Sequence, residues 1–390
     1  MLQWQHQGIE HQAVWRSESG LPAPRRVMVA DDTMPADTAY RLACEGTALL
    51  WQGDFQNARH LMEAIKRRLD KPARSHSAKA RKAKAAAADP VGVAQAFHLH
   101  RQAQGQRARV LGSILIPLQA DYSIALRRAP DWRAACIQAW GAPAADAGVQ
   151  AVSLRELLGV VGAHEWRKQG VPVPELGKAA RIHPHYGVFS PVRGEYVQLV
   201  KEAPLPEAGR ALAFDIGVGT GVLSAVLAQR GVQRVIATDM SPRALVCAQE
   251  NLERLGLSDK VQLQQTHLFP EGQAGLIVCN PPWVPARAVT TLEQAVYDDN
   301  SAMLRGFLSD LRAHLLPEGE AWLILSDLAE HLGLRSRAQL LEWIAAAGLR
   351  VVGRLDTKPS HGKAQDSKDP LHAARAAEVT SLWRLAGVSS

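Results

Sequence analysis

The chain has 390 residues, of which 47% are hydrophobic and 21% charged. One hydrophobic core rarely grows beyond about 250–300 residues, so this length predicts two domains. The chain contains neither the roughly 20 uninterrupted apolar residues of a membrane span nor an apolar signal core at its N-terminus, so we expect a soluble, cytoplasmic protein.

The positive charge is concentrated in one segment. The formal net charge is +7, and residues 59–84 carry ten Lys or Arg against two acidic residues, a net charge of +8. Attraction to an anionic partner such as RNA is therefore expected there. For residues 75–90, which overlap this segment, a solvated charged loop is the favoured interpretation and a dedicated binding arm is the alternative. The four cysteines form no short Cys-x-x-Cys pair, and no metal site is predicted.

Residues 1–175 are predicted to form a mainly helical domain. Apolar residues recur three and four positions apart in residues 38–52, 57–69, 121–140 and 154–169, whereas strand patterns are weak. A basic connector is expected at about 71–90, where the chain has almost nothing to bury. Prolines and glycines in 170–178 favour a domain boundary at about 175/176. We interpret the first part as a substrate-recognition domain.

Residues 176–390 alternate short apolar strands with amphipathic helices. Strands are predicted at 211–217, 234–239, 260–268, 275–279 and 320–326, with helices from about Val222 to Gly231, from Ser241 to Gly256, and over 303–316. This alternation predicts a mostly parallel sheet covered on both faces. The end of the chain differs, because 349–357 and 378–385 enclose a polar stretch without a crossover helix. Two antiparallel strands are expected there.

A glycine-rich loop follows the first of these strands. The sequence Asp-Ile-Gly-Val-Gly-Thr-Gly at 215–221 has little side-chain bulk, so a ligand can approach its backbone. Asp239 ends the next strand, where a carboxylate can bind ribose hydroxyls. The G-x-G-x-G spacing, with Val222 in place of the third glycine of a dinucleotide site, makes an NAD-dependent oxidoreductase a remote alternative.

The fourth strand is followed by Asn280, Pro281, Pro282 and Trp283. Carboxyl ends of parallel strands meet at one edge of the sheet, so Asn280 should lie beside the glycine loop. The Asn280 side-chain oxygen and the Pro281 carbonyl could accept bonds from both N–H groups of a planar amide or amino group. The two prolines would fix the backbone, and Trp283 would stack on the acceptor. An ordinary turn with a packed Trp is the alternative interpretation.

Three motifs in this order resemble the class I S-adenosylmethionine-dependent methyltransferases of the Asn-Pro-Pro-Tyr/Trp branch. They are DIGVGTG at 215–221, TDMSPRAL at 238–245 and CNPPW at 279–283, and the resemblance covers about residues 180–390. It implies a Rossmann-like, seven-stranded, mostly parallel sheet with a reversed C-terminal strand. It also implies S-adenosyl-L-methionine as the cofactor.

The resemblance also assigns residues to the two sites. The implied cofactor contacts are Asp215, Gly217, Val218, Gly219, Thr220, Gly221, Asp239, Met240, His267, Leu268 and Asn280. His267 stands where the family often has an acidic residue that contacts the adenine. The segment 188–200 is similar to one in protein-glutamine methyltransferases and some RNA methyltransferases. Arg193 in this segment could contact the substrate together with Asn280, Pro281 and Trp283, or could form a surface ion pair with Glu195.

The leading hypothesis is an N-methyltransferase that acts on a planar NH₂ group. By the resemblance, a protein glutamine amide in the translation machinery is placed first. The exocyclic amino group of adenine or guanine in rRNA or tRNA is the alternative. A non-catalytic adaptor that binds RNA or the ribosome is the third possibility.

Overall fold

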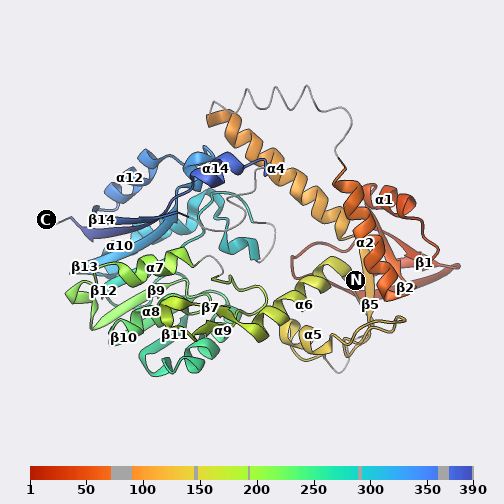
Figure 1. The fold of residues 1–390 in the computed structure, drawn as a ribbon, viewed down its shortest axis with the longest axis horizontal. Helices are drawn as coiled ribbons and strands as arrows, with labels where there is room; N and C mark the ends of the chain where they lie inside the picture. The colour runs from red at the N-terminus through yellow and green to blue at the C-terminus, as the bar shows by residue number, and fades with distance from the viewer. Residues whose placement is uncertain (72–89, 145–147, 192–193, 289–291, 359–368, 389–390) are drawn as a thin grey trace. The chain divides into compact units, whose positions relative to one another are not determined.

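The computed structural model describes residues 1–71, 90–144, 148–191, 194–288, 292–358 and 369–388 (Figure 1). The chain divides into two compact units. The first comprises Met1–Ala87 and His98–Glu165, and the second comprises Ala88–Phe97 and Trp166–Ser390. This division falls earlier than the Pro- and Gly-rich segment 170–178. Most of the expected basic connector at 71–90, including residues 72–89, lies outside the described residues.

A six-stranded sheet runs through the first unit, in the order β1-β2-β6-β5-β4-β3. Its strands are β1 (Leu2–His6), β2 (Ile9–Arg16), β3 (Arg26–Ala30), β4 (Thr47–Trp51), β5 (Ile114–Leu118) and β6 (Gln150–Ser153). The expectation of a mainly helical domain with little strand structure was therefore wrong. Every residue of β4 is buried, so its sequence shows no alternation of polar and apolar residues and could not be told from the helical pattern expected for residues 38–52.

Helices pack against this sheet. They are α1 (Ala36–Cys44), α2 (Phe55–Leu69), the later part of α4 (Pro90–Leu111), α5 (Arg133–Trp140) and most of α6 (Leu154–Gln169). Helix α2 begins after Asp54, whose carboxylate accepts a hydrogen bond from the Gln56 backbone N–H. The buried Asp54 carboxylate also pairs with Arg127 and Arg128, and the Arg128 hydrogen bond is the main reason that its pKa falls to about 2.

The second unit contains a seven-stranded sheet in the order β11-β10-β9-β12-β13-β15-β14. Its strands are β9 (Leu212–Ile216), β10 (Arg234–Asp239), β11 (Val261–Gln265), β12 (Ala274–Cys279), β13 (Leu315–Ser326), β14 (Leu349–Thr357) and β15 (Thr380–Gly387). Only β15 is antiparallel to its neighbours, β13 and β14. The predicted Rossmann-like sheet with a reversed last strand is confirmed.

Helices cover both faces of this sheet, as predicted. Helices α7 (Glu195–Glu202), α8 (Val222–Gln229) and α9 (Pro242–Arg254) enclose one hydrophobic cluster, and α10 (Ala302–His314) and α12 (Arg337–Ala346) enclose the other. The Ser241 side chain caps α9 by accepting from the Ala244 backbone N–H. The second unit also contains the short strands β7 (Val171–Pro172) and β8 (Arg181–Ile182), the helices α11 (Leu328–His331) and α14 (His372–Ala377), and several short 3-10 helices. Within the described part of the chain, no helix is long and apolar enough to cross a membrane.

The strand order of the second unit reverses between β9 and β12. Strands β10 and β11 continue to one side, and β13 continues to the other. In open α/β sheets, ligands bind in the crevice outside the carboxyl ends of strands at this switch point. The glycine loop follows β9 and Asn280 follows β12, so both lie at that point.

Candidate active site

A cavity of about 790 Å³ lies at the carboxyl ends of β9, β10 and β12. Most of the residues predicted for the site line it, namely Gly217, Val218, Gly219, Thr220, Asp239, Met240, His267, Leu268, Asn280, Pro281, Pro282 and Trp283. Residues at the carboxyl ends of four neighbouring strands, β9, β10, β11 and β12, therefore meet at one cavity.

The glycine loop forms a tight turn between β9 and α8. Gly217, Gly219 and Gly221 have φ angles of +81°, +52° and +82°, which favour glycine over any other residue. The backbone N–H groups of Gly217 and Val218 both donate to Thr238 of β10, at 2.9 and 2.8 Å. A Cβ at Gly219 would meet no atom nearer than 4.0 Å. The turn thus presents bare backbone to the cavity.

Asp239 stands at the end of β10 and closes this turn. Its carboxylate accepts from the Gly219 backbone N–H at 3.1 Å and from the Ser241 backbone N–H at 2.9 Å. An ionised carboxylate offers about four acceptor positions. Asp239 therefore keeps acceptor capacity for the hydroxyl groups of a ribose while its orientation is fixed by the backbone.

Asp215 and Gly221 do not line the cavity, although both were predicted to contact the cofactor. The Asp215 side chain is buried beneath the loop, where it accepts a hydrogen bond from the Ser224 hydroxyl at 2.6 Å. Burial raises its pKa to about 6. Gly221 approaches α9, since a Cβ there would lie 3.3 Å from Ala248. Both residues therefore support the loop on the side that faces away from the cavity.

The residues after β11 form another wall of the cavity. His267 is exposed and Leu268 is buried with a φ of +58°. The Thr238 hydroxyl donates to the Leu268 carbonyl at 2.6 Å and holds this turn against β10. Met240 is 64% exposed at the same cavity. This wall is therefore apolar, with a single imidazole at its edge.

The Asn-Pro-Pro-Trp segment directly follows the buried strand β12. Asn280 and Trp283 are half-buried and both line the cavity. The Trp283 indole N–H donates to Asn280 Oδ1 at 2.8 Å. The sequence predicted only an aromatic face at Trp283, and this hydrogen bond was not anticipated. Arg193 lies outside the described residues.

The sequence did not reveal a further wall, which is formed by residues 294–303. The backbone N–H of Asp298 donates to the Val284 carbonyl at 2.9 Å, which ties this segment to the chain just after Trp283. The Asp298 carboxylate accepts from the backbone N–H groups of Met303 and Leu304 at the start of α10. The run Tyr-Asp-Asp-Asn-Ser before a helix pattern is the signal that could have indicated this cap.

An apolar cluster borders the cavity on the side of Trp283. Its buried members are Phe97, Val284, Ala286, Leu332 and Leu371, and Trp283 and Tyr297 pack against it. Phe97 belongs to the part of α4 that packs with the second unit. This cluster gives that side of the cavity an apolar lining.

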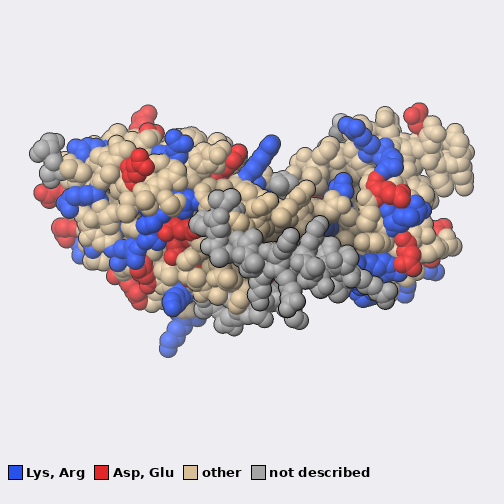
Figure 2. Space-filling model, turned by 90° about the horizontal axis from the view of Figure 1, so that it is seen from above, with Lys and Arg blue, Asp and Glu red and all other residues tan. Residues whose placement is uncertain are grey.

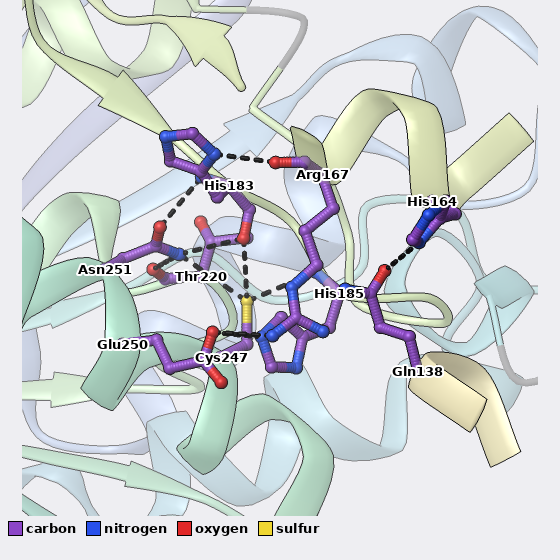
Figure 3. A network of polar contacts seen from close by, with 9 residues as sticks. All are labelled: Gln138, His164, Arg167, His183, His185, Thr220, Cys247, Glu250 and Asn251. Atoms are coloured by element: carbon purple, nitrogen blue, oxygen red, sulfur yellow. Dashed lines mark hydrogen bonds and ion pairs between the residues drawn. The ribbon is translucent and has the colours of Figure 1, made fainter. Parts of the chain in front are cut away.

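The segment before α7 is held against α9 by a buried polar network (Figure 3). Asn251 Oδ1 accepts from the His183 backbone N–H at 2.8 Å, and Asn251 Nδ2 donates to the carbonyl of Thr220 in the glycine loop at 3.1 Å. The same segment continues into Gly187 and Val188, which line the cavity. Asn251 thus joins the glycine loop to a cavity wall.

The histidines of this network have structural partners. The His185 ring lies 3.0 Å from Glu250, which also pairs with Arg167 at 2.6 Å. Burial is the main cause that lowers the pKa of His185. The His183 ring contacts the Arg167 carbonyl at 2.6 Å. The His-x-His pair at 183–185 therefore anchors the cavity wall to α6 and α9.

These features define a Rossmann-like protein that binds a nucleoside cofactor. Asp239 offers acceptors for a ribose, the glycine loop presents open backbone, and the wall with Leu268 offers an apolar surface for a base. The residues present fit S-adenosylmethionine. Asn280 adds a polar group that such a cofactor site does not itself require.

Comparison with known proteins identifies the class. The methyltransferase small domain family matches residues 179–336. A tRNA1(Val) (adenine(37)-N6)-methyltransferase of Shewanella loihica is 31% identical over 186 residues, which cover 45% of this chain and 72% of that protein. The chain therefore belongs to the class I S-adenosylmethionine-dependent methyltransferases. It is an enzyme, and its cofactor is S-adenosylmethionine.

Two further comparisons are more partial. A release factor glutamine methyltransferase of Cereibacter sphaeroides is 32% identical over 161 residues, or 37% of this chain and 56% of that protein, so the chain spans little over half of that relative. The crystal structure of a ribosomal protein L11 methylase from Lactobacillus delbrueckii subsp. bulgaricus has a TM-score of 0.38 at 18% identity, covering 54% of this chain and 88% of that one.

Proposed function

We propose that the protein methylates the NH₂ group of a glutamine side chain in a protein of the translation machinery. The observation that carries this proposal is the position of Asn280. Cys279 of β12 pairs with Ile216 of β9, so Asn280 and Gly217 are the next residues of two adjacent strands. Both line the same cavity. An amide oxygen is thus available directly beside the cofactor loop.

Bound S-adenosylmethionine supplies a methyl group activated by a sulfonium sulfur. The acceptor nitrogen of an amide is a poor nucleophile because its lone pair is delocalised. Asn280 Oδ1 and the Pro281 carbonyl can accept bonds from its two N–H groups and favour a more pyramidal, more reactive nitrogen. Proline fixes φ and has no N–H, which keeps this backbone rigid. No strong base is required, since the proton can leave once the nitrogen is cationic.

The cavity wall supports the same role. Trp283 and Phe97 add apolar surface to the cavity that Asn280 lines. Hydrogen bonds in such a site are stronger than in bulk water because the local dielectric constant is low. Positioning of this kind can contribute several kcal/mol to a barrier without acid or base chemistry.

Glutamine remains first because a release factor glutamine methyltransferase is among the relatives. The exocyclic amino group of adenine or guanine in tRNA or rRNA is the second candidate. Two observations favour it: the tRNA adenine methyltransferase is matched over a larger share of its length, and α2 exposes Arg59, Lys66 and Arg67. In either case we assign acceptor recognition to the first unit and place the activity in the cytoplasm.

Tritiated methyl transfer into a ribosome-containing cell extract tests the proposal. Label that is released by protease and survives nuclease supports a protein acceptor. Label with the opposite behaviour assigns the activity to RNA. Absence of labelling, together with absence of saturable heat on titration with S-adenosylmethionine, would contradict the enzyme and favour an adaptor.

Salt dependence separates the two acceptors independently. Neutralised phosphates release counterions, so RNA affinity falls steeply as salt rises from about 50 to 200 mM. Methylation of a protein loop should change much less over this range, because screening affects only the exposed charges.

A further inference from the structure

The indole of Trp283 is hydrogen-bonded to the side chain that we place in the acceptor site. Its N–H donates to Asn280 Oδ1 at 2.8 Å. An indole nitrogen can only donate, so the atom that faces it must be the carboxamide oxygen and not the NH₂ group. This contact therefore fixes which way round the Asn280 amide lies.

The two partners are held by the protein around them. Trp283 is half-buried and packs against the hydrophobic clusters on both faces of the seven-stranded sheet, as well as against the cluster of Phe97 and Leu371. Asn280 lies between Cys279, at the buried end of β12, and the buried Pro281. The hydrogen bond is thus made by two groups whose positions are set before any acceptor binds.

The orientation of the amide matters for the proposed reaction. A carbonyl oxygen can accept two hydrogen bonds, so the indole leaves one position on Asn280 Oδ1 for the acceptor. The opposite orientation would turn the Asn280 NH₂ towards the acceptor NH₂, and two donors would face each other. The oxygen and nitrogen ends of a carboxamide are nearly equal in size, so packing around Asn280 distinguishes the two orientations of its amide poorly. A phenylalanine or tyrosine ring has no donor at the position of the indole nitrogen.

We propose that Trp283 is a positioning residue, which holds the Asn280 carboxamide with its oxygen available to the acceptor NH₂. This inference rests on the proposed function of Asn280. It adds a role that the aromatic face of Trp283 does not supply, because the effect comes from the indole N–H.

Trp283→Phe removes the N–H and keeps an aromatic side chain. The matched control is Trp343→Phe, since Trp343 is also half-buried, packs against one of the same clusters and lies away from the cavity. Two quantities are measured: the initial rate of tritiated methyl transfer into a ribosome-containing extract, and the Kd for S-adenosylmethionine by calorimetry. We expect Trp283→Phe to lower the rate about tenfold, as for the loss of one hydrogen bond, with the Kd unchanged within about twofold. Trp343→Phe should change neither.

Two comparisons with Asn280→Ala separate this role from packing. In that background Trp283→Phe should cause no further loss, because its partner is absent. Independently of activity, the Trp283 indole proton should exchange with solvent more slowly in the wild type than in Asn280→Ala, as measured by ¹⁵N NMR. Three results would overturn the inference: a wild-type rate of methyl transfer in Trp283→Phe, a further loss of rate when Trp283→Phe is added to Asn280→Ala, or equal exchange of the Trp283 indole proton in the wild type and in Asn280→Ala. Normal turnover in Asn280→Ala alone would contradict the proposed function instead.

Discussion

At the scale of single residues, Asp239 should decide cofactor affinity. Its carboxylate is oriented by the backbone N–H groups of Gly219 and Ser241, so Asp239→Ala removes both the ribose acceptor and a support of the loop. We expect the Kd for S-adenosylmethionine, measured by calorimetry, to rise by at least about tenfold. Asp259→Ala, which removes an exposed carboxylate away from the cavity, should leave the Kd unchanged. Equal affinity in wild type and Asp239→Ala would rule out the assignment.

Asp215 should make stability depend on pH. Burial raises its pKa to about 6 in the folded protein, against 3.8 for the unperturbed group. Between these values the folded state holds a proton that the unfolded chain has lost, so this residue's contribution to the free energy of unfolding falls as the pH rises from about 4 to about 6.

Asp215→Asn should remove this component. Urea unfolding at several pH values should then show a smaller decrease in stability across this window than in the wild type, by a few kcal/mol at most. An identical pH profile in both proteins would contradict the raised pKa.

Most of the site residues could be predicted from the sequence because they belong to short motifs in which residue type and spacing indicate the role. The three positive-φ glycines and the strand-ending Asp239 are visible in the sequence as spacing. The position of Asp215 beneath the loop, bonded to Ser224 in the first turn of α8, is not visible there, because it depends on how the chain folds back after the loop. Nor is the bond between Trp283 and Asn280, since residues three positions apart in a loop meet only if the backbone turns.

At the scale of elements, α9 supports the cofactor loop through Asn251. Asn251→Ala would leave the His183 N–H and the Thr220 carbonyl without this partner in the interior, at a cost of about 1–3 kcal/mol in the free energy of unfolding for each unsatisfied group. We also expect a weaker S-adenosylmethionine affinity, because Thr220 belongs to the glycine loop. Gln249→Ala on the exposed face of the same helix is the control. Both quantities are measured by urea unfolding and calorimetry, and a variant that loses stability with unchanged affinity would limit Asn251 to a structural role.

The two sheets differ in how well the sequence predicts them. In the second unit, strand and helix alternate from β9 to β11, and Ser241 and Gly256 mark the ends of α9. In the first unit, β4 follows α1 after two residues and is buried along its whole length. Its apolar residues therefore continue the apparent helix pattern. The pairing of β5 with β6 and of β2 with β6 joins segments far apart in the chain, which no local pattern can reveal.

At the scale of the whole molecule, charge distribution bears on the acceptor. On the face drawn in Figure 2, Lys and Arg side chains are interspersed with Asp and Glu. The exposed bases of α2 are a distinct feature, because Arg59, Lys66 and Arg67 lie on one helix.

Neutralising these bases tests whether they act in recognition. If the acceptor is a protein glutamine, the triple variant Arg59→Gln, Lys66→Gln, Arg67→Gln should transfer methyl groups at close to the wild-type rate at 150 mM salt, a physiological ionic strength of about 0.15 M. If the acceptor is RNA, the methyl-transfer rate should fall when the acceptor in the extract is limiting, and the rate should depend less steeply on salt than in the wild type. A steep loss with this variant would therefore favour the RNA acceptor over glutamine. His60→Gln on the same helix, which is exposed and formally neutral, is the control for helix stability.

The position of Asn280 carries the proposed chemistry, so Asn280→Ala tests it most directly. The measurement is the rate of tritiated methyl transfer into a ribosome-containing extract, together with the Kd for S-adenosylmethionine on the same preparation. We predict a rate about a hundredfold or more below the wild type, comparable to the loss of a hydrogen-bonding group that acts on the reacting centre, with cofactor affinity retained. A variant that binds the cofactor and turns over at close to the wild-type rate would contradict the account.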